Sequence, residues 1–304
     1  MNPGLRVVIA LGGNALALRG ARLDAETQER RVAAAAEALA PLARAHELVV
    51  THGNGPQVGW LALGDEARPL DALDAETEGL IGYWIERELA GRLPGKDVAT
   101  LLTRVEVDPF DPAFGQPTKP IGPVYDQQTA RRLAAERGWA VAQERAGWRR
   151  VVPSPEPRGL PGLRAVKVLV EAGVTVVCAG GGGIPVARDS EGRQRGVEAV
   201  VDKDLTTALL ATALAADALL LLTDVPAIYA DWPEPAREPL REVTPAEIRS
   251  LSLDAGSMAP KAEAALRFVE ATGASAAIGA LEDAAALLAG SAGTRVVAGL
   301  AGRS

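Results

Sequence analysis

The segment LRVVIALGGNAL, residues 5–16, joins a short apolar run to a pair of glycines, and it decides the fold class. Valine and isoleucine favour strands, and a run without polar interruptions is typical of a strand covered on both faces. The two glycines then predict a tight turn at the carboxyl end of that strand. Because this order recurs along the chain, with helix-period segments between the runs, the sequence predicts an α/β protein with a mainly parallel central sheet.

The first run predicts a strand at residues 5–11, and similar runs predict strands at residues 47–51, 98–103, 174–180, 196–201, 218–223, 274–279 and 294–298. Helical periodicity predicts helices at residues 25–45, 56–66, 76–92, 162–172, 204–215, 245–252, 260–272 and 282–289. A chain of 304 residues, 48% of them hydrophobic, is long enough to bury a sizeable core, either as one large domain or as two lobes.

The composition argues against several classes of protein. A single cysteine, Cys178, excludes an internal disulfide, and with His46 and His52 it forms no zinc site at a usual spacing. A net charge of −7 disfavours nucleic acid as the main partner. The N-terminal apolar run is too short for a signal peptide, and no apolar stretch is long enough to span a bilayer. We therefore expect a cytoplasmic protein without a membrane partner and without a metal site of its own.

One region interrupts the alternation of strands and helices. Residues 108–161 begin with DPFDPAFGQPTKPIGPVYDQQ and end near VVPSPEPRGLPG, so proline clusters bracket the region on both sides. Prolines fix φ and suit rigid turns, which favours an inserted subdomain or flap. A disordered linker is the alternative, but apolar residues such as Trp139, Val141 and Trp148 disfavour it.

Three glycine-rich turns follow predicted strands: GGNAL at residues 12–16, THGNGPQVG at 51–59 and AGGGGIPV at 179–186. The carboxyl ends of parallel strands share one edge of a sheet, so we expect these loops to meet there. Glycine amides and helix N-termini suit an anion, phosphate above all, although one such turn alone is also an ordinary tight turn. Within the run of four glycines, Gly181 and Gly182 are candidates for close passage of a substrate or nucleotide.

Two better-known phosphate motifs fit poorly. No GxxxxGKS or GxxxxGKT string occurs, which excludes a P-loop. Gly53, Gly55 and Gly59 form a relaxed dinucleotide-binding pattern after a strand. The helical character of residues 60–92 leaves no second strand ending in an acid, as a nicotinamide dehydrogenase requires. A nicotinamide dehydrogenase stays as an alternative.

Lysine is rare in this chain, because only five of its 32 basic residues are lysines. Lys119, Lys203 and Lys261 lie in glycine- or proline-framed segments, whereas Lys96 and Lys167 are expected on the surface. Lysines are usually surface charges, but here arginine fills that role. A compact ammonium suits phosphoryl transfer, in which the protein mainly positions groups and stabilises charge.

Crowded lysines need carboxylates to keep their protons. Asp202 and Asp204 flank Lys203 where a strand-like run gives way to a helix. Asp204 is expected to cap that helix, to orient nearby lysines, or to do both. Asp202 is considered only as a helper.

The motifs together resemble the carbamate kinases. GGNAL, HGNGPQVG, IGYW, PTKPIGP, RRVVPSPEP, AGGGGIPV, GVEAVVDKD, LTDV and GSMAPK occur in the order of that family and cover nearly the whole chain. The resemblance implies the amino acid kinase fold, an open αβα sandwich with a small inserted flap subdomain, and a homodimer. It also implies reversible phosphoryl transfer between ATP and carbamate, with ATP or ADP and Mg²⁺ held through the nucleotide phosphates.

Carried onto this chain, the resemblance implies a substrate lobe at about residues 1–215, the flap at about 108–161 and a nucleotide lobe at about 216–304. It assigns Gly12, Gly13 and Asn14 to the transferred phosphate, and Gly53, Asn54 and Gly55 to the carbamate end. Lys203 and Lys261 would neutralise the phosphoryl group, Asp204 would organise them, and Lys119 would reach in from the flap. The nucleotide would lie near Thr223, Asp224, Val225, Tyr229, Met258 and Lys261, of which Tyr229 and Met258 equally suit the core.

The chain departs from the family at two positions. Glu78 stands where the family usually has glutamine, and Pro226 follows LTDV where an acid or amide is usual. A further negative charge beside an anionic substrate is costly, so we expect Glu78 to face away from the site. Pro226 puts the contacts to the base in doubt. A related acylphosphate-forming amino acid kinase and a non-catalytic nucleotide sensor are the other functions considered.

Overall fold

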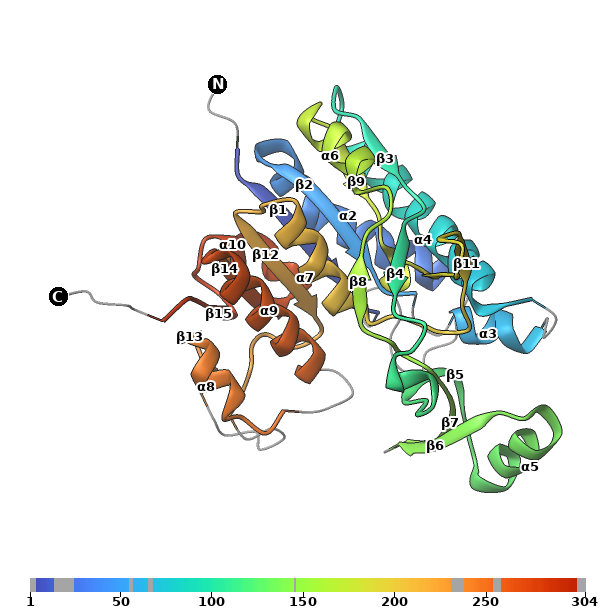
Figure 1. The fold of residues 1–304 in the computed structure, drawn as a ribbon. Coiled ribbons are helices and arrows are strands. Elements are labelled where there is room, and N and C mark those ends of the chain that lie inside the picture. The colour runs from blue at the N-terminus through green and yellow to red at the C-terminus, as the bar shows by residue number, and fades with distance from the viewer. Residues whose placement is uncertain are drawn as a thin grey trace.

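An eight-stranded sheet forms the centre of the computed structural model, which describes residues 4–13, 25–54, 57–64, 68–144, 146–230, 238–253 and 258–299 (Figure 1). Neighbouring strands run parallel except β14 and β15, so the predicted mainly parallel sheet is confirmed. In spatial order the strands are β13 (Glu242–Val243), β15 (Thr294–Val296), β14 (Ser275–Ala280), β12 (Ala218–Thr223), β1 (Arg6–Leu11), β2 (Glu47–His52), β9 (Thr175–Val177) and β3 (Val98–Thr100).

Side chains of the central strands alternate between two apolar cores. In β1, Val8 and Ala10 belong to one core and Val7, Ile9 and Leu11 to the other, all of them fully buried. Each fully buried aliphatic side chain contributes roughly 1.5–3 kcal/mol, so both faces must be covered. One face is covered by α2 (Ala25–Ala45), α4 (Leu70–Arg92) and α10 (Ala284–Leu288), the other by α6 (Leu163–Glu171), α7 (Lys203–Ala213) and α9 (Met258–Thr272).

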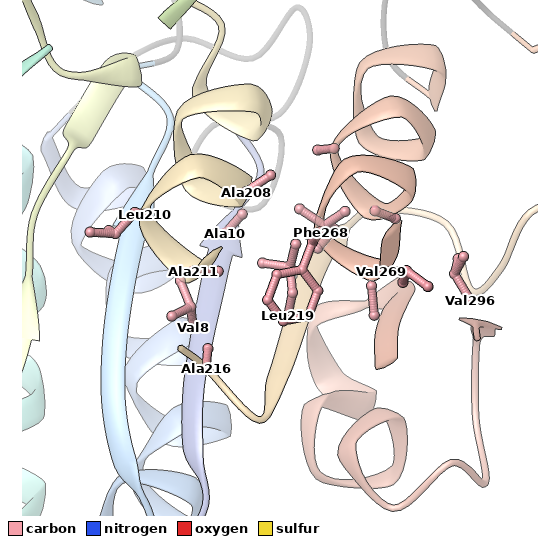
Figure 2. Close-up of a cluster of buried hydrophobic side chains, with 14 of the residues drawn as sticks. Val8, Ala10, Ala208, Leu210, Ala211, Ala216, Leu219, Phe268, Val269 and Val296 are labelled. Atoms are coloured by element: carbon pink, nitrogen blue, oxygen red, sulfur yellow. The ribbon is translucent and has the colours of Figure 1, made fainter. Parts of the chain in front are cut away.

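The core that contains Val8 and Ala10 joins α7 and α9 to the sheet. Figure 2 shows Leu219 of β12 between Ala208 and Ala211 on α7 and Phe268 and Val269 on α9. This packing matters for the site, because it fixes the starts of both helices at the carboxyl edge of the sheet.

Two smaller sheets lie outside the central one. The first has the order β11 (Gln194–Gly196), β10 (Ile184–Arg188), β4 (Arg104–Val107) and β8 (Pro157–Gly159). The second, β5 (Lys119–Tyr125), β7 (Gly147–Val152) and β6 (Ala140–Glu144), carries α5 (Gln127–Arg137) and lies to one side of the main body (Figure 1). Residues of the proline-bracketed region therefore form a folded flap and not a disordered linker. The lobe and flap boundaries themselves stay predictions.

Most predicted elements occur, but the strand at residues 196–201 is wrong. Only its first residue belongs to a strand, β11, and the chain then runs irregularly to α7. Ala199, Val200 and Val201 are buried all the same, and the amide of Val200 bonds to Pro153 O at 3.0 Å. The apolar run reflects burial under other segments, which the sequence does not separate from strand pairing. Among the described residues, none of the helices has the length and apolarity needed to cross a membrane.

Candidate active site

The glycine turns meet at the carboxyl edge of the central sheet, because they follow the adjacent strands β1, β2 and β9. The amide of Gly12 donates to Leu222 O and that of Gly53 to Leu11 O, both at 3.0 Å. A side chain at Gly53 would come within 2.9 Å of the Gly13 backbone. The first two turns therefore pack directly on one another. Asn14 and Gly55, which were also predicted here, lie outside the described residues.

The turn at residues 179–183 follows β9 and contains the short helix η2 (Gly180–Gly182). Gly181 and Gly182 have φ values of 69° and 102°, in a region that favours glycine. A side chain at Gly182 would also lie 2.3 Å from Val201 O. Backbone conformation and packing thus account for these glycines without a ligand, and close passage of a substrate stays a prediction.

Asp202, and not Asp204, caps α7. Its carboxylate accepts the amides of Asp204 at 2.9 Å and Leu205 at 3.2 Å. The other oxygen accepts Lys119 Nζ of the flap at 2.6 Å. The expectation that Asp204 caps the helix is therefore wrong, and Asp202, considered only as a helper, connects the flap to the start of α7.

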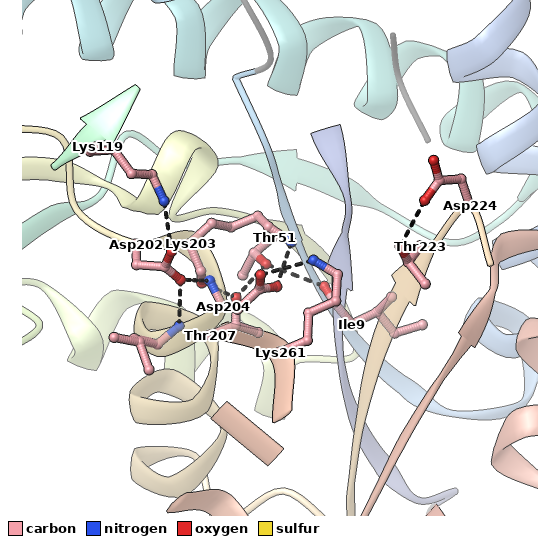
Figure 3. Close-up of polar contacts among 11 residues, drawn as sticks. Ile9, Thr51, Lys119, Asp202, Lys203, Asp204, Thr207, Thr223, Asp224 and Lys261 are labelled. Carbon is pink, nitrogen blue, oxygen red and sulfur yellow. Dashed lines mark hydrogen bonds and ion pairs between the residues drawn. The ribbon is translucent and has the colours of Figure 1, made fainter. Parts of the chain in front are cut away.

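Asp204 instead lies between two lysines (Figure 3). Lys203 Nζ donates to Oδ1 at 2.8 Å, and Lys261 Nζ, from the first turn of α9, donates to Oδ2 at 2.9 Å. All three side chains are less than 10% exposed. We call Lys203, Asp204 and Lys261 the lysine cluster. With both lysines protonated it carries one net positive charge in a buried position.

Burial and charge shape the titration of the lysine cluster. Burial raises the pKa of Asp204, but the two ammonium groups outweigh it and hold that pKa well below its usual range. Burial lowers the pKa of Lys203 to about 8 against the opposing charge of Asp204. Lys203 is therefore mainly protonated at neutral pH, and a bound anion would stabilise that form further.

Threonines hold α7 against the glycine turns. Thr206 Oγ1 donates to Gly182 O at 2.9 Å. Thr207 Oγ1 donates to Lys203 O at 2.6 Å and lies 2.7 Å from Thr51 Oγ1 at the end of β2. These bonds fix the start of α7 relative to two of the glycine turns, so the lysine cluster and the turns form one rigid edge.

The residues predicted for the nucleotide lie at neighbouring positions. Thr223 ends β12 and donates to the carboxylate of Asp224 at 3.1 Å, apart from the lysine cluster in Figure 3. Val225 and Tyr229 are half-buried. Met258 opens α9, three residues before Lys261, and packs against the apolar core. This packing supports a core role for Met258, which leaves a contact to the nucleotide base as a prediction.

Glu78 does not face away from the site. The structure buries it completely under the turn at residues 179–183, where its carboxyl group accepts the amides of Gly180 at 2.9 Å and Thr103 at 3.1 Å. Asp74, one turn earlier on α4, is 1% exposed and accepts Asn54 Nδ2 at 3.2 Å. Their spacing continues the buried stripe of α4 through Ile81 and Ile85, a signal that the sequence contained.

Comparisons with known proteins agree with this architecture. The sequence profile of the "Amino acid kinase family" matches residues 5–279. The chain belongs to the amino acid kinase family.

Within that family the similarity is to carbamate kinases. The chain is 51% identical to the carbamate kinase of Rhizobium meliloti, over 95% of this chain and 92% of the relative. It is 50% identical to that of Haemophilus influenzae, over 96% of both chains. The structure of a carbamate kinase from Giardia lamblia bound to AMP-PNP superposes with a TM-score of 0.87 at 38% identity, covering 98% of this chain and 100% of the other.

Proposed function

We propose that this protein is a carbamate kinase, which converts ADP and carbamoyl phosphate reversibly into ATP and carbamate. The observation that carries the proposal is the lysine cluster, a buried pair of ammonium groups on one carboxylate at the edge where the glycine turns meet. Similarity to carbamate kinases over nearly the whole chain supports the same reaction.

In the direction of carbamoyl phosphate synthesis, a carbamate oxygen attacks the γ-phosphorus in line. The new O–P bond forms while the bond to the β,γ-bridging oxygen breaks, and ADP leaves with that electron pair. The attacking oxygen is already an anion, so no general base is needed. Lys203 and Lys261 stabilise the charge on the equatorial oxygens, and Asp204 fixes their positions.

We assign the remaining groups by their place around the cluster. Gly12 and Gly13 would lie against the transferred phosphate, and Gly53 and Gly181, with Asn54, against the carbamate end. The amides of Gly12 and Gly53 themselves bond to Leu222 O and Leu11 O, so these two glycines would contribute close approach of the backbone. Asn14 would also hold the transferred phosphate, and Gly55 the carbamate end. Gly182 would contact the substrate beside Gly181. Lys119 would reach the phosphoryl group when the flap closes, leaving Asp202, its partner in this structure.

The nucleotide would lie over the second lobe, near Thr223, Asp224, Val225, Tyr229 and Met258. Mg²⁺ would enter on the nucleotide phosphates and neutralise part of their charge. Within the described part of the chain, no group of three His, Cys, Asp or Glu side chains could hold a metal ion. We assign the ion to the nucleotide phosphates.

We further propose a cytoplasmic homodimer. Leu80 and Tyr83 on α4 and Leu102 after the edge strand β3 are 46%, 54% and 59% exposed, and a side chain at Gly79 would contact Leu102. Pairing these apolar side chains between two copies would cover them. Light scattering of the wild type and of Leu102→Asp tests the assembly: the variant should be monomeric, and a wild-type monomer would refute it.

The substrate is tested by coupled ATP formation from ADP with three phosphoryl donors: carbamoyl phosphate, acetyl phosphate and N-acetylglutamyl phosphate. We expect carbamoyl phosphate to give by far the largest kcat/KM. A preference for N-acetylglutamyl phosphate would instead indicate a related amino acid kinase. No turnover with any donor, together with AMP-PNP binding, would indicate a nucleotide sensor.

A further inference from the structure

Two buried carboxyl groups lie beneath the glycine turns and take no part in the reaction described above. Asp74 and Glu78 are one turn apart on α4 and are 1% and 0% exposed. Neither forms a salt bridge with any residue for which the structure gives a position. We call the two residues the carboxyl pair.

Glu78 connects α4 to two backbone segments at once. Its carboxyl group accepts the amide of Gly180 in the 179–183 turn and the amide of Thr103 after β3. Thr103 in turn accepts the amide of Ala179 on Oγ1 at 3.0 Å and that of Ile184 on its carbonyl at 2.8 Å. Glu78 is therefore the innermost support of the turn, at both its entry and its exit.

Asp74 supports the neighbouring turn in a similar way. Asn54, which follows β2, donates its side-chain amide to Asp74 Oδ1. The same amide nitrogen would lie 2.7 Å from a side chain at Gly181, so it is held between α4 and the 179–183 turn. Asp74 thus sets the orientation of an amide group at the boundary of two turns.

The surroundings of both carboxyl groups favour the neutral acid. Burial raises the pKa of Glu78 to about 8, and burial with the nearby charges of Glu78, Asp71 and Glu198 raises that of Asp74 well above its usual range. His52, which lies with Glu78 on the Cβ side of Gly180, has a pKa lowered by burial to about 4 and is neutral. Ionisation of Glu78 would therefore place a negative charge directly behind a turn that receives an anion.

We propose that Asp74 and Glu78 are positioning residues for the carbamate end of the site, with Glu78 fixing the 179–183 turn and Asp74 fixing the amide of Asn54. This inference rests on the proposed function, because it needs carbamate or carbamoyl phosphate as the ligand. It predicts that the carboxyl pair affects the small substrate more strongly than the nucleotide.

Steady-state kinetics of ATP formation by the intact protein test the inference. Glu78→Ala should raise the KM for carbamoyl phosphate about tenfold or more, as expected for two buried amides left without acceptors, while the KM for ADP stays within about twofold. Glu78→Gln, which keeps an acceptor oxygen, should recover most of that loss at pH 7. Asp74→Ala should likewise raise the KM for carbamoyl phosphate, and Asp74→Asn should recover most of that loss.

Glu86→Ala provides the matched control. Glu86 lies two turns further along α4 and also accepts a backbone amide, that of Thr100 at 2.8 Å, but this amide belongs to β3 and not to a glycine turn. It should change neither KM. Equal changes in both KM values for Glu78→Ala, or no more change than in the control, would overturn the inference. If wild-type protein forms no ATP from carbamoyl phosphate, the proposed function itself fails.

The pH dependence of kcat/KM would not change if Glu78 had a purely structural role. Measuring it requires only the wild type and Glu78→Gln. Wild-type kcat/KM for carbamoyl phosphate should fall above pH 8 more steeply than one ionisation allows, because Lys203 loses its charge while Glu78 gains one. Glu78→Gln should show the one-proton fall of Lys203 alone. Identical profiles would contradict the inference.

Discussion

The lysine cluster and the carboxyl pair are both buried at the same edge of the sheet, yet the first is ionised and the second favours the neutral acid. In the lysine cluster, Asp204 lies within 2.9 Å of both ammonium groups, and burial there preserves ions. In the carboxyl pair, Glu78 has backbone amides but no cation among its described partners, and burial there favours the neutral acid. The contrast shows that the partner, more than the depth of burial, decides whether a buried group is charged.

The largest expected effect comes from removing one charge of the lysine cluster. Lys203→Ala or Lys261→Ala should lower kcat for ATP formation about 100- to 1,000-fold, the usual loss when one preorganised charge donor is removed. Lys167→Ala on α6, outside the site, should leave kcat unchanged. Near-normal turnover by either cluster variant, with folding intact by circular dichroism, would contradict the assignment.

Breaking the lysine cluster at its centre should also destabilise the fold. Asp204→Asn leaves two buried ammonium groups without a carboxylate, at a cost of about 3–5 kcal/mol in the free energy of unfolding. Urea denaturation measures that change. Glu263→Gln, which removes a partner of Arg267 in an exposed pair on α9, should cost less than about 1 kcal/mol. Equal losses in the two variants would mean that the cluster contributes no special stability.

Through Glu78, the carboxyl pair should make the free energy of unfolding fall as the pH rises. The pKa of Glu78 is raised in the folded state, so its contribution to stability is complete below about pH 4.5 and is lost as the pH rises through about 8. Over that window wild-type stability should fall relative to Glu78→Gln by roughly 1.4 kcal/mol per pH unit at most. Urea denaturation at pH 5, 6.5 and 8 measures this difference. A constant difference would show that Glu78 is ionised throughout.

The smallest effect is expected at Asp202, which joins the start of α7 to the flap. Asp202→Asn keeps a good helix cap but loses the ionic partner that holds Lys119 of the flap beside the lysine cluster before closure. Stability should therefore hold while kcat/KM drops about tenfold. Asp202→Ala should lose about 1 kcal/mol of stability as well. Thermal unfolding and kinetics on both variants separate the two roles. Equal stability of the two variants would argue against the cap.

Much of the central sheet could be predicted because its strands are apolar on both faces. The helix at residues 25–45 and the strand at 218–223 occur with the predicted bounds. The smaller sheets were missed, since their half-exposed strands contain prolines and charges, as in β5 and β7. The strand expected at residues 196–201 was wrong because burial of Val200 and Val201 occurs without pairing.

The site was predictable where local composition carried the signal. Lysine is rare in this chain, and that singled out Lys203 and Lys261 before their shared carboxylate was visible. The contact between Lys119 and Asp202 joins positions 83 residues apart, which no local pattern reveals. Glu78 was placed wrongly because its environment depends on a turn from β9, even though it continues the buried stripe of its helix.

The central claim is that the buried positive charge of the lysine cluster stabilises a bound phosphoryl group. Proton uptake on binding AMP-PNP tests this claim most directly. Calorimetry at pH 8 in buffers of different ionisation enthalpy measures it. With a pKa of about 8 for free Lys203, we predict uptake of about half a proton by the wild type and a clear reduction in Lys203→Ala. Binding enthalpies that do not depend on the buffer, or equal uptake by both proteins, would contradict the account.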